Sequence, residues 1–288
     1  MTQDFFIQLT LAIKSKDPRK IVQATDFFVS QGYDLSEISS LDLKSLAKIS
    51  VFVRSEKEKN KVEKSAKQLF SKPWIFETKT LQQEDWLTKW QDHYKISGIG
   101  KKFAIVPQWK KEEYRGRRIP VYLNPEGAFG SGTHQTTKLM VMLMEEYFRN
   151  VKSFLDAGTG TGILSIVAHH LGADVIKAFD HDFASVKTAK LNAKLNEIRG
   201  IDFSKEDIFD YQDSKVYDVV AANMISRILE ESQSVLFARV KKGGYLIVSG
   251  IVRKNFDGFL KRFKSDKFKR VKTVYARSWG ACVYKRIK

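Results

Sequence analysis

The sequence predicts an α/β protein in which a doubly wound, mostly parallel sheet follows a smaller α+β domain. Three observations support this fold class. From about Val151 onward, apolar strand-like segments alternate with segments of helical periodicity, as in a parallel sheet with crossover helices. Three glycines, Gly158, Gly160 and Gly162, follow the first of these strands. The first eighty residues instead have the order strand, helix, strand, helix, strand.

The first domain is predicted over residues 1–82. Its strands are expected at residues 4–13, 46–55 and 74–81, with a further short strand at 33–38, and its helices at 21–31 and 56–70. Each helix carries its apolar residues on one side, and Gly32 ends the first helix. This order predicts a small ferredoxin-like sandwich. Because no catalytic constellation falls within it, we interpret it as a recognition or packing module.

Residues 83–120 are predicted to connect the two domains. Trp86 and Trp90 are four residues apart, which favours a short helix. The remainder alternates between strand-like and turn-like segments and is expected to lead into the second domain.

The second domain is predicted over residues 121–288. Its strands are expected at 151–158, 174–180, 217–223 and 244–250, with a weak strand near 200–207, and its helices at 162–172, 183–198 and 225–240. Ligands of such sheets bind at the carboxyl ends of the strands, where the strand order reverses. Candidate site residues are therefore sought at those ends.

Composition limits the class of protein. Of the 288 residues 43% are hydrophobic, enough for a substantial core, and we expect no membrane span and no signal peptide. Cys282 is the only cysteine, which excludes an internal disulfide and a cluster of thiolate metal ligands. We therefore expect a cytosolic protein.

The net charge of +17 is unevenly distributed. Residues 251–288 contain 13 Lys and Arg against 2 acids, whereas residues 1–50 balance at 6 and 6. One interpretation is an anionic partner such as RNA or a ribosomal surface. The other, equally weighted, is a solvated lysine-rich face of an ordinary helix and strand.

The glycine cluster predicts a nucleoside site. Glycines at a strand-to-helix turn let the backbone approach a ligand, and the helix N-terminus adds oriented N–H groups. Asp180, twenty residues after Gly160, ends the next strand and can accept both hydroxyls of a ribose. Ile163 stands where the dinucleotide pattern needs its third glycine, which disfavours a nicotinamide dehydrogenase. A purely structural tight turn is the weaker alternative.

Asn223 ends the apolar strand YDVVAAN. A polar amide at this edge can accept a hydrogen bond from an amine nucleophile or contact a cofactor. Taken alone, an Asn that caps the next helix is the commoner explanation.

A second glycine-rich segment, GAFGSGTHQTT at residues 127–137, lies upstream of FLDAGTGTGILS at 154–165. Alone it would be a connector. Together with Asp180 and Asn223, these motifs resemble class I S-adenosylmethionine-dependent methyltransferases, in particular PrmA, the bacterial family that modifies ribosomal protein L-eleven. The resemblance covers nearly the whole chain. It departs from the family at Asn124–Gly127 and at Gln135, where the acceptor would approach.

The resemblance implies a seven-stranded Rossmann-like catalytic domain that binds S-adenosyl-L-methionine. It implies cofactor contacts from Thr137, Gly158, Asp180 and Asn223, to which the glycine loop adds Gly160, while Phe129 is expected to cover the ligand. It also implies methylation of lysine side-chain or N-terminal amines of ribosomal protein L-eleven by a monomer. No metal is expected.

In such a transfer the amine must be neutral and aligned with the methyl group, and Asn223 is the candidate for orienting it. No general base is assigned, since a loop residue such as His134 fits a bracing role equally well. Three alternatives remain: methylation of rRNA, methylation of a different protein lysine, and a non-catalytic interaction protein that retains the fold.

Overall fold

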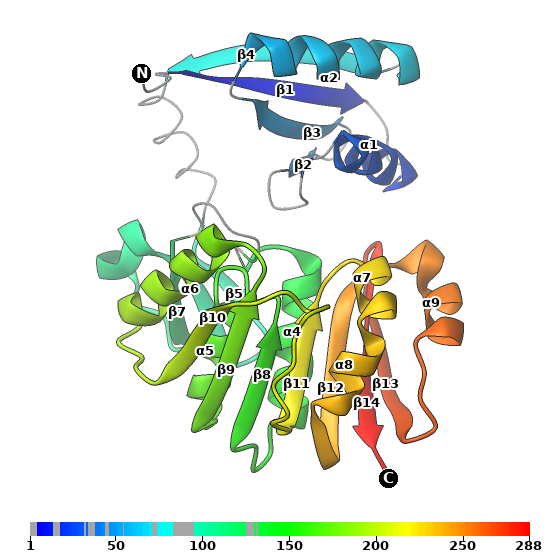
Figure 1. Cartoon of the computed structure of the whole chain (residues 1–288). Helices are drawn as coiled ribbons and strands as arrows, with labels where there is room; N and C mark the ends of the chain where they lie inside the picture. Colours follow the sequence, from blue (N-terminus) through cyan, green and yellow to red (C-terminus); the bar gives the residue numbers. More distant parts are fainter. Residues whose placement is uncertain are drawn as a thin grey trace. The chain divides into compact units, whose positions relative to one another are not determined.

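The chain divides into two compact units, Met1–Tyr94 and Lys95–Lys288 (Figure 1). This computed structural model describes residues 5–13, 18–31, 33, 38–43, 46–53, 55–70, 74–82, 95–124, 130 and 132–288. Each unit has its own hydrophobic core and is treated separately.

The smaller unit is a four-stranded antiparallel sheet with two helices. Its strands are β1 (Phe5–Ile13), β2 (Ser39–Leu43), β3 (Leu46–Val53) and β4 (Ile75–Gln82), in the order β2-β3-β1-β4, and its helices are α1 (Pro18–Ser30) and α2 (Glu56–Leu69). Alternate residues of β1 are buried beneath both helices, which share one core cluster with the sheet. Ser55 caps α2 by accepting a hydrogen bond from the backbone N–H of Glu58 at 3.2 Å.

The short strand predicted at residues 33–38 falls mostly on residues that the structure does not describe, and the strand it does describe in this region is β2 at Ser39–Leu43. Residues 34–37 lie outside the described part of the chain. Tyr33 is buried in the core instead, its ring against Phe28 and its hydroxyl donating to Glu58 at 2.7 Å. These contacts explain why its apolar character does not mark a strand.

The larger unit begins with a three-stranded sheet. Its strands are β5 (Ser97–Ile99), β6 (Phe103–Pro107) and β7 (Ile119–Leu123), with the 3-10 helix η1 (Gln108–Glu113) between β6 and β7. Residues 95–120 of the predicted connector thus belong to the larger unit, because Phe103, Ile105 and Val121 are buried in its core. Residues 83–94, with the helix expected around the two tryptophans, lie outside the described residues.

A seven-stranded sheet forms the centre of the larger unit (Figure 1). In spatial order its strands are β10 (Ile201–Lys205), β9 (Val175–Asp180), β8 (Ser153–Ala157), β11 (Tyr217–Asn223), β12 (Val240–Val252), β14 (Trp279–Arg286) and β13 (Phe268–Ala276). The first five are parallel, and β14 is antiparallel to both of its neighbours. This arrangement confirms the predicted fold class, including the weak strand near residues 200–207.

Helices cover both faces of this sheet. One face packs against α4 (Gln135–Tyr147), α5 (Ile163–His170) and α6 (Phe183–Leu195), and the other against α7 (Ser226–Glu231), α8 (Gln233–Ala238) and α9 (Phe256–Arg262). A short 3-10 helix, η2 (Arg253–Asn255), precedes α9. Within the described residues, no helix is both long and apolar enough to cross a membrane.

The single helix predicted at residues 225–240 is wrong, because the chain forms two short helices that meet at Ser232. The buried Ser232 hydroxyl donates to the carbonyl of Ile228 at 2.6 Å. A serine that bonds back to the preceding turn competes with the helical backbone. The apolar periodicity continues through the break and does not reveal it.

Candidate active site

The site residues predicted from the sequence gather where the strand order reverses. From β8 the chain runs outward through β9 to β10, then returns to β11 on the other side of β8. The carboxyl ends of β8, β9 and β11 therefore meet at one edge, where loops leave a crevice for ligands. Gly158 follows β8, Asp180 ends β9 and Asn223 ends β11.

The glycine loop requires its glycines. Gly158, Gly160 and Gly162 have φ values of 74°, 53° and 81°, in the left-handed region that side chains rarely adopt. A Cβ on Gly158 would also lie 2.7 Å from Cε of Met224. The backbone N–H groups of Gly158 and Thr159 both donate to the carbonyl of Phe179 at 2.9 Å, which ties the loop to the end of β9.

Asp180 links the second strand to this loop. Its Oδ2 accepts from the Gly160 N–H at 2.9 Å, and its Oδ1 accepts from the Asp182 N–H at 3.0 Å. The residue is only 8% exposed. Since a carboxylate has about four lone-pair sites, capacity remains for the hydroxyls of a ribose. The structure therefore brings Asp180 and Gly160 together as the spacing predicted.

Asp156, the residue that precedes the loop at the end of β8, is fully buried. Its Oδ2 accepts from the hydroxyls of Thr159 at 2.8 Å and Ser165 at 2.6 Å. Its Oδ1 is buried with no hydrogen-bond partner among the described residues. Burial raises the pKa of this carboxyl to about 6, against the effect of the two hydroxyl donors. Asp156 thus braces both ends of the loop with little water around it.

The two glycine-rich segments are in direct contact. The hydroxyl of Thr161 donates to the carbonyl of Gly130 at 2.6 Å. Gly130 has a φ of 103°, and a Cβ there would lie 2.8 Å from that hydroxyl oxygen. The upstream segment is therefore a neighbour of the loop. The expectation that Phe129 covers the ligand falls on residues 125–129, outside the described part of the chain.

The upstream segment ends in the first turn of α4. His134 caps this helix, accepting from the Thr136 N–H, and its Nδ1 lies 2.7 Å from the Thr136 hydroxyl. The His134 ring also meets the Trp279 ring edge-on, with centroids 5.0 Å apart. Burial, with a smaller effect from Lys138, lowers the pKa of His134 to about 4. These contacts favour the bracing role over that of a base at neutral pH.

Thr137 and Asn223 each present a buried oxygen that lacks a partner. The Oγ1 of Thr137 and the Oδ1 of Asn223 accept and donate no hydrogen bond among the described residues. Such orphaned atoms cost about 1–3 kcal/mol each unless a ligand or water satisfies them. They fit a polar ligand at this edge.

Asn223 does not cap the following helix. The N-cap position of α7 is Ile225, and no side chain bonds to its first turn. The Met224 N–H donates to the Ser249 carbonyl at 3.1 Å, so the chain stays paired with β12 for one residue past the end of β11. Gly250 permits this approach, because a Cβ there would collide with the Met224 backbone. The strand end holds the Asn223 side chain without help from α7.

Asn192 of α6 and Asn196, the C-cap residue of that helix, form a clamp that the sequence reasoning missed. The amide of Asn192 accepts from the Asn124 N–H at 2.7 Å and donates to the Asn124 carbonyl at 3.2 Å and the Thr161 carbonyl at 2.9 Å. The amide of Asn196 bonds both backbone groups of Tyr122, at 2.9 and 2.7 Å. One helix thereby fixes the end of β7 and the glycine loop. Two asparagines four apart, Asn192 in the last turn of a helix and Asn196 at its C-cap, were the available signal.

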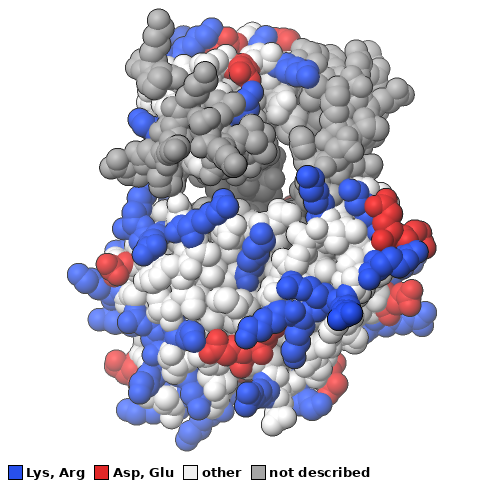
Figure 2. Space-filling model, turned by 180° about the vertical axis from the view of Figure 1, so that it is seen from behind, with Lys and Arg blue, Asp and Glu red and all other residues white. Residues whose placement is uncertain are grey.

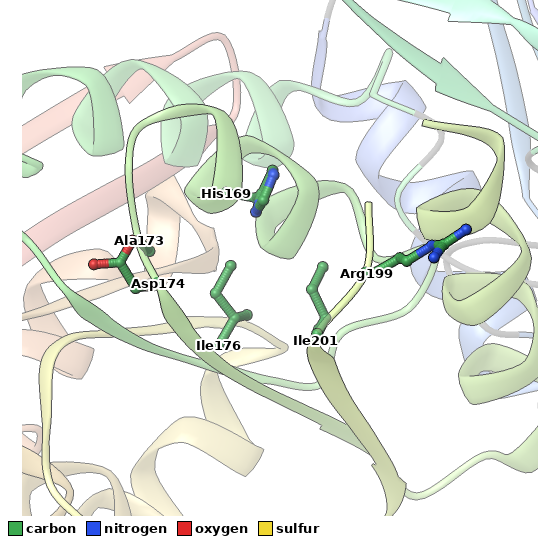
Figure 3. A pocket seen from close by; sticks show the side chains of 7 residues that line it. His169, Ala173, Asp174, Ile176, Arg199 and Ile201 are labelled. Carbon is green, nitrogen blue, oxygen red and sulfur yellow. The ribbon is translucent and has the colours of Figure 1, made fainter. Parts of the chain in front are cut away.

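A separate hollow lies at the opposite edge of the sheet (Figure 3). It measures about 180 Å³ and is lined by His169, near the end of α5, and by residues at the amino ends of β9 and β10, among them Ile176 and Ile201. In Figure 3 the side chains of Asp174 and Arg199 point away from each other. The hollow lies at the amino ends of the strands, whereas Gly158, Asp180 and Asn223 lie at their carboxyl ends. We therefore do not assign the nucleoside site to the hollow.

A seven-stranded sheet of this order, with a glycine loop and an acid at the switch edge, defines a Rossmann-like methyltransferase. Residues 10–287 match the family described as ribosomal protein L11 methyltransferase (PrmA). The chain belongs to this family, as the sequence motifs indicated. The predicted enzyme class, a methyltransferase, is confirmed with it.

Individual relatives agree with this assignment. The ribosomal protein L11 methyltransferase of Dictyoglomus turgidum is 32% identical over 225 residues, 78% of this chain and 74% of its own. That of Staphylococcus saprophyticus is 32% identical over 213 residues, 74% and 68% of the two chains. The crystal structure of a ribosomal protein L11 methylase from Lactobacillus delbrueckii subsp. bulgaricus superimposes with a TM-score of 0.63 at 30% identity, covering 68% of this chain and all of that one.

Proposed function

We propose that this protein transfers methyl groups from S-adenosyl-L-methionine to lysine or N-terminal amines of ribosomal protein L11. Three buried oxygens that lack partners carry the proposal, Thr137 Oγ1, Asp156 Oδ1 and Asn223 Oδ1. Asp156 lies at the end of the strand that leads into the loop whose glycines all have positive φ, and Asn223 ends the neighbouring strand β11. A polar nucleoside ligand with both donors and acceptors would satisfy this set, whereas an apolar ligand would leave it unpaired.

The cofactor would be held by the residues that the motifs single out. The backbone of Gly158 and Gly160 approaches it closely, Asp180 accepts from the ribose hydroxyls, and Thr137 and Asn223 offer their unpaired oxygens. When bound, S-adenosyl-L-methionine supplies an electrophilic methyl group on a sulfonium sulfur. Everything else that the reaction needs is alignment and exclusion of water.

The acceptor amine must lose a proton before it can attack. A lysine amine has an unperturbed pKa of about 10.4, and burial favours its neutral form. The Oδ1 of Asn223 can accept one N–H of the neutral amine, which turns the nitrogen lone pair toward the methyl group. The proton leaves to water, since His134, with a pKa of about 4, is too weak a base to take it from an ammonium group.

The acceptor follows from the family, whose members act on ribosomal protein L11 by their names. We assign its recognition to the first domain, predicted over residues 1–82, and methyl transfer to the unit Lys95–Lys288. We further propose a cytoplasmic monomer. Contact with rRNA or the ribosome through basic surface belongs to the same proposal and rests on the net charge of +17.

The deciding experiment is mass spectrometry of purified ribosomal protein L11 after incubation with this protein and S-adenosyl-L-methionine. We expect L11 to gain methyl groups on amines, located by fragmentation, and naked rRNA in a parallel reaction to gain none. Methylated rRNA with unmodified L11 would replace this proposal by the RNA alternative. A reaction without enzyme controls for chemical methylation.

A further inference from the structure

A cluster of cations lies at the amino-terminal edge of the seven-stranded sheet, opposite the candidate active site. Arg149 follows α4, Lys242 lies near the start of β12, Lys267 precedes β13, Lys269 begins it, and Lys285 and Arg286 end β14. We call these six residues the basic edge. All are exposed or partly exposed. Figure 2 shows that Lys and Arg outnumber Asp and Glu on the face turned away from the view of Figure 1.

The basic edge is poorly neutralised. Nearby Lys152, Lys241 and Lys272 are paired with Asp174, Asp218 and Glu146, at 3.1, 3.0 and 3.2 Å. In contrast, no ion pair joins the six residues of the basic edge to any acid among the described residues. Arg286 bonds only to the backbone carbonyls of Val240 and Lys288. An anionic partner would therefore meet cations that are not already paired with an acid among the described residues.

Two of these cations stand directly opposite each other. Lys269 of β13 is the cross-strand partner of Lys285 of β14. Side chains of such antiparallel partners lie on the same face of the sheet, and like charges there repel. Repulsion between these two lysines lowers the stability of the protein when no ligand is bound. An anionic group between them replaces this repulsion with attraction.

Aromatic rings lie beside the lysine pair. The Lys285 ammonium is 5.7 Å from the centroid of the Tyr245 ring, and Tyr245 meets Tyr147 edge-on at 5.0 Å. Both tyrosines are partly exposed and pack against the core from outside. Cations that track a phosphate backbone beside aromatic rings that stack on bases are the combination that binds single-stranded nucleic acid.

We propose that the basic edge binds single-stranded RNA, with Lys269 and Lys285 on its phosphates and Tyr245 against a base. RNA is favoured over an acidic polypeptide because a polypeptide would use the lysines but would lack bases to stack on the tyrosine. The surface is separate from the site of methyl transfer, so RNA and S-adenosyl-L-methionine are expected to bind at the same time.

The test is fluorescence anisotropy with a labelled, mixed-sequence single-stranded RNA, measured over a range of salt concentrations. The variant Lys269→Gln/Lys285→Gln is expected to weaken binding about tenfold and to reduce the slope of log K against log salt by about 1.4, since each lost phosphate contact contributes about 0.7. Tyr245→Leu is expected to weaken binding while leaving the salt slope unchanged. Calorimetric binding of S-adenosyl-L-methionine shows that each variant is folded.

The matched control is Lys187→Gln/Lys190→Gln, which removes the same charge from two exposed lysines of α6. Its RNA affinity should equal that of the unaltered protein. Equal loss in both double variants would mean diffuse attraction and overturn the proposal. It would be overturned as well by failure of the unaltered protein to bind RNA, by displacement of RNA by poly-glutamate at equal charge, or by binding to anionic lipid vesicles in place of RNA.

Discussion

At the residue scale, Asp180 makes one kind of contact within the protein and, in our proposal, a second with the cofactor. Its carboxylate accepts from the N–H groups of Gly160 and Asp182, and it is proposed to accept from the ribose hydroxyls as well. Asp180→Ala should raise the Kd for S-adenosyl-L-methionine at least about tenfold, because hydrogen bonds to a charged group contribute about 1.5–3 kcal/mol each. Isothermal titration calorimetry measures this. Asp202→Ala, which removes an exposed acid paired with Lys177, is the matched control. An unchanged Kd in Asp180→Ala would exclude the ribose contact.

Asn223 is expected to act on turnover. Asn223→Ala should lower kcat for L11 methylation by about 10²-fold, the loss that follows when a reacting group is displaced by about 1 Å. The far-ultraviolet circular dichroism should be unchanged, because α7 does not depend on this side chain. Steady-state kinetics with saturating L11 test the prediction, and Asn255→Ala, at an exposed position, is the control. Normal turnover in Asn223→Ala would remove the orienting role.

Asp156 should make stability depend on pH. Its folded-state pKa of about 6 lies above the ordinary 3.8, so the folded protein binds its proton more tightly than the unfolded chain. The burial of Asp156 therefore destabilises the folded protein least below pH 4, where its carboxyl is protonated in both states. The free energy of unfolding falls as pH rises from about 4 to 6. The free energy of unfolding of Asp156→Asn minus that of the unaltered protein should therefore be larger at pH 7 than at pH 4.5. Urea denaturation at the two pH values measures the difference, and a constant difference would contradict the raised pKa.

The site residues that could be predicted from the sequence are those that belong to a motif with a recognisable spacing. Gly160 and Asp180 are twenty residues apart, and a strand, turn, helix and strand of ordinary length bring them into contact. Asn192 and Asn124 are also joined, yet nothing local in either segment identifies the other. Their pairing depends on how α6 packs against β7, which a single sequence does not specify.

At the element scale, α6 serves as a support for two loops at once. Asn192→Ala would remove the hydrogen bonds to the backbone of Asn124 and the donor to the buried Thr161 carbonyl, at a cost of about 1–3 kcal/mol. We expect a lower melting temperature together with weaker S-adenosyl-L-methionine binding, because the glycine loop loses its anchor. Differential scanning fluorimetry and calorimetry measure the two effects.

Substitution by Asp separates these bonds. Asn192→Asp can still accept from the Asn124 N–H but cannot donate to the Thr161 carbonyl. It should therefore lose cofactor affinity while keeping part of its stability. Lys194→Ala, on the exposed side of the same helix, is the control. Equal behaviour of the Asp variant and the control would show that the Thr161 bond does not position the loop.

Element type was predictable wherever the apolar period was long, and boundaries were not. The parallel strands are apolar on both faces, because helices cover both, and such runs stand out. The break at Ser232 coincides with a single side-chain hydrogen bond, from its hydroxyl to the carbonyl of Ile228. Such side-chain contacts change where an element begins or ends but leave the apolar periodicity of the sequence unchanged, so the periodicity does not reveal them.

At the scale of the whole molecule, each unit has a separate core. The unit Lys95–Lys288 contains every proposed cofactor contact, so we expect it to fold alone and to bind S-adenosyl-L-methionine with unchanged Kd. Without residues 1–94 its kcat/KM for L11 should fall at least about tenfold, a loss of about 1.4 kcal/mol of transition-state binding. Side-by-side kinetics of the full chain and this unit test this. Undiminished kcat/KM would remove the recognition role of the first domain.

The place of β14 has a consequence for how the protein is made. This strand, at residues 279–286, lies between β12 and β13, and among the described residues β13 pairs with no other strand. It also brings the Gly280 carbonyl to the Ser249 hydroxyl, beside the turn that follows β11. During synthesis β13 emerges before the strand that must separate it from β12. The sheet is therefore completed only when residues 279–286 have left the ribosome, and a nascent chain halted before residue 279 would have an open edge at β12.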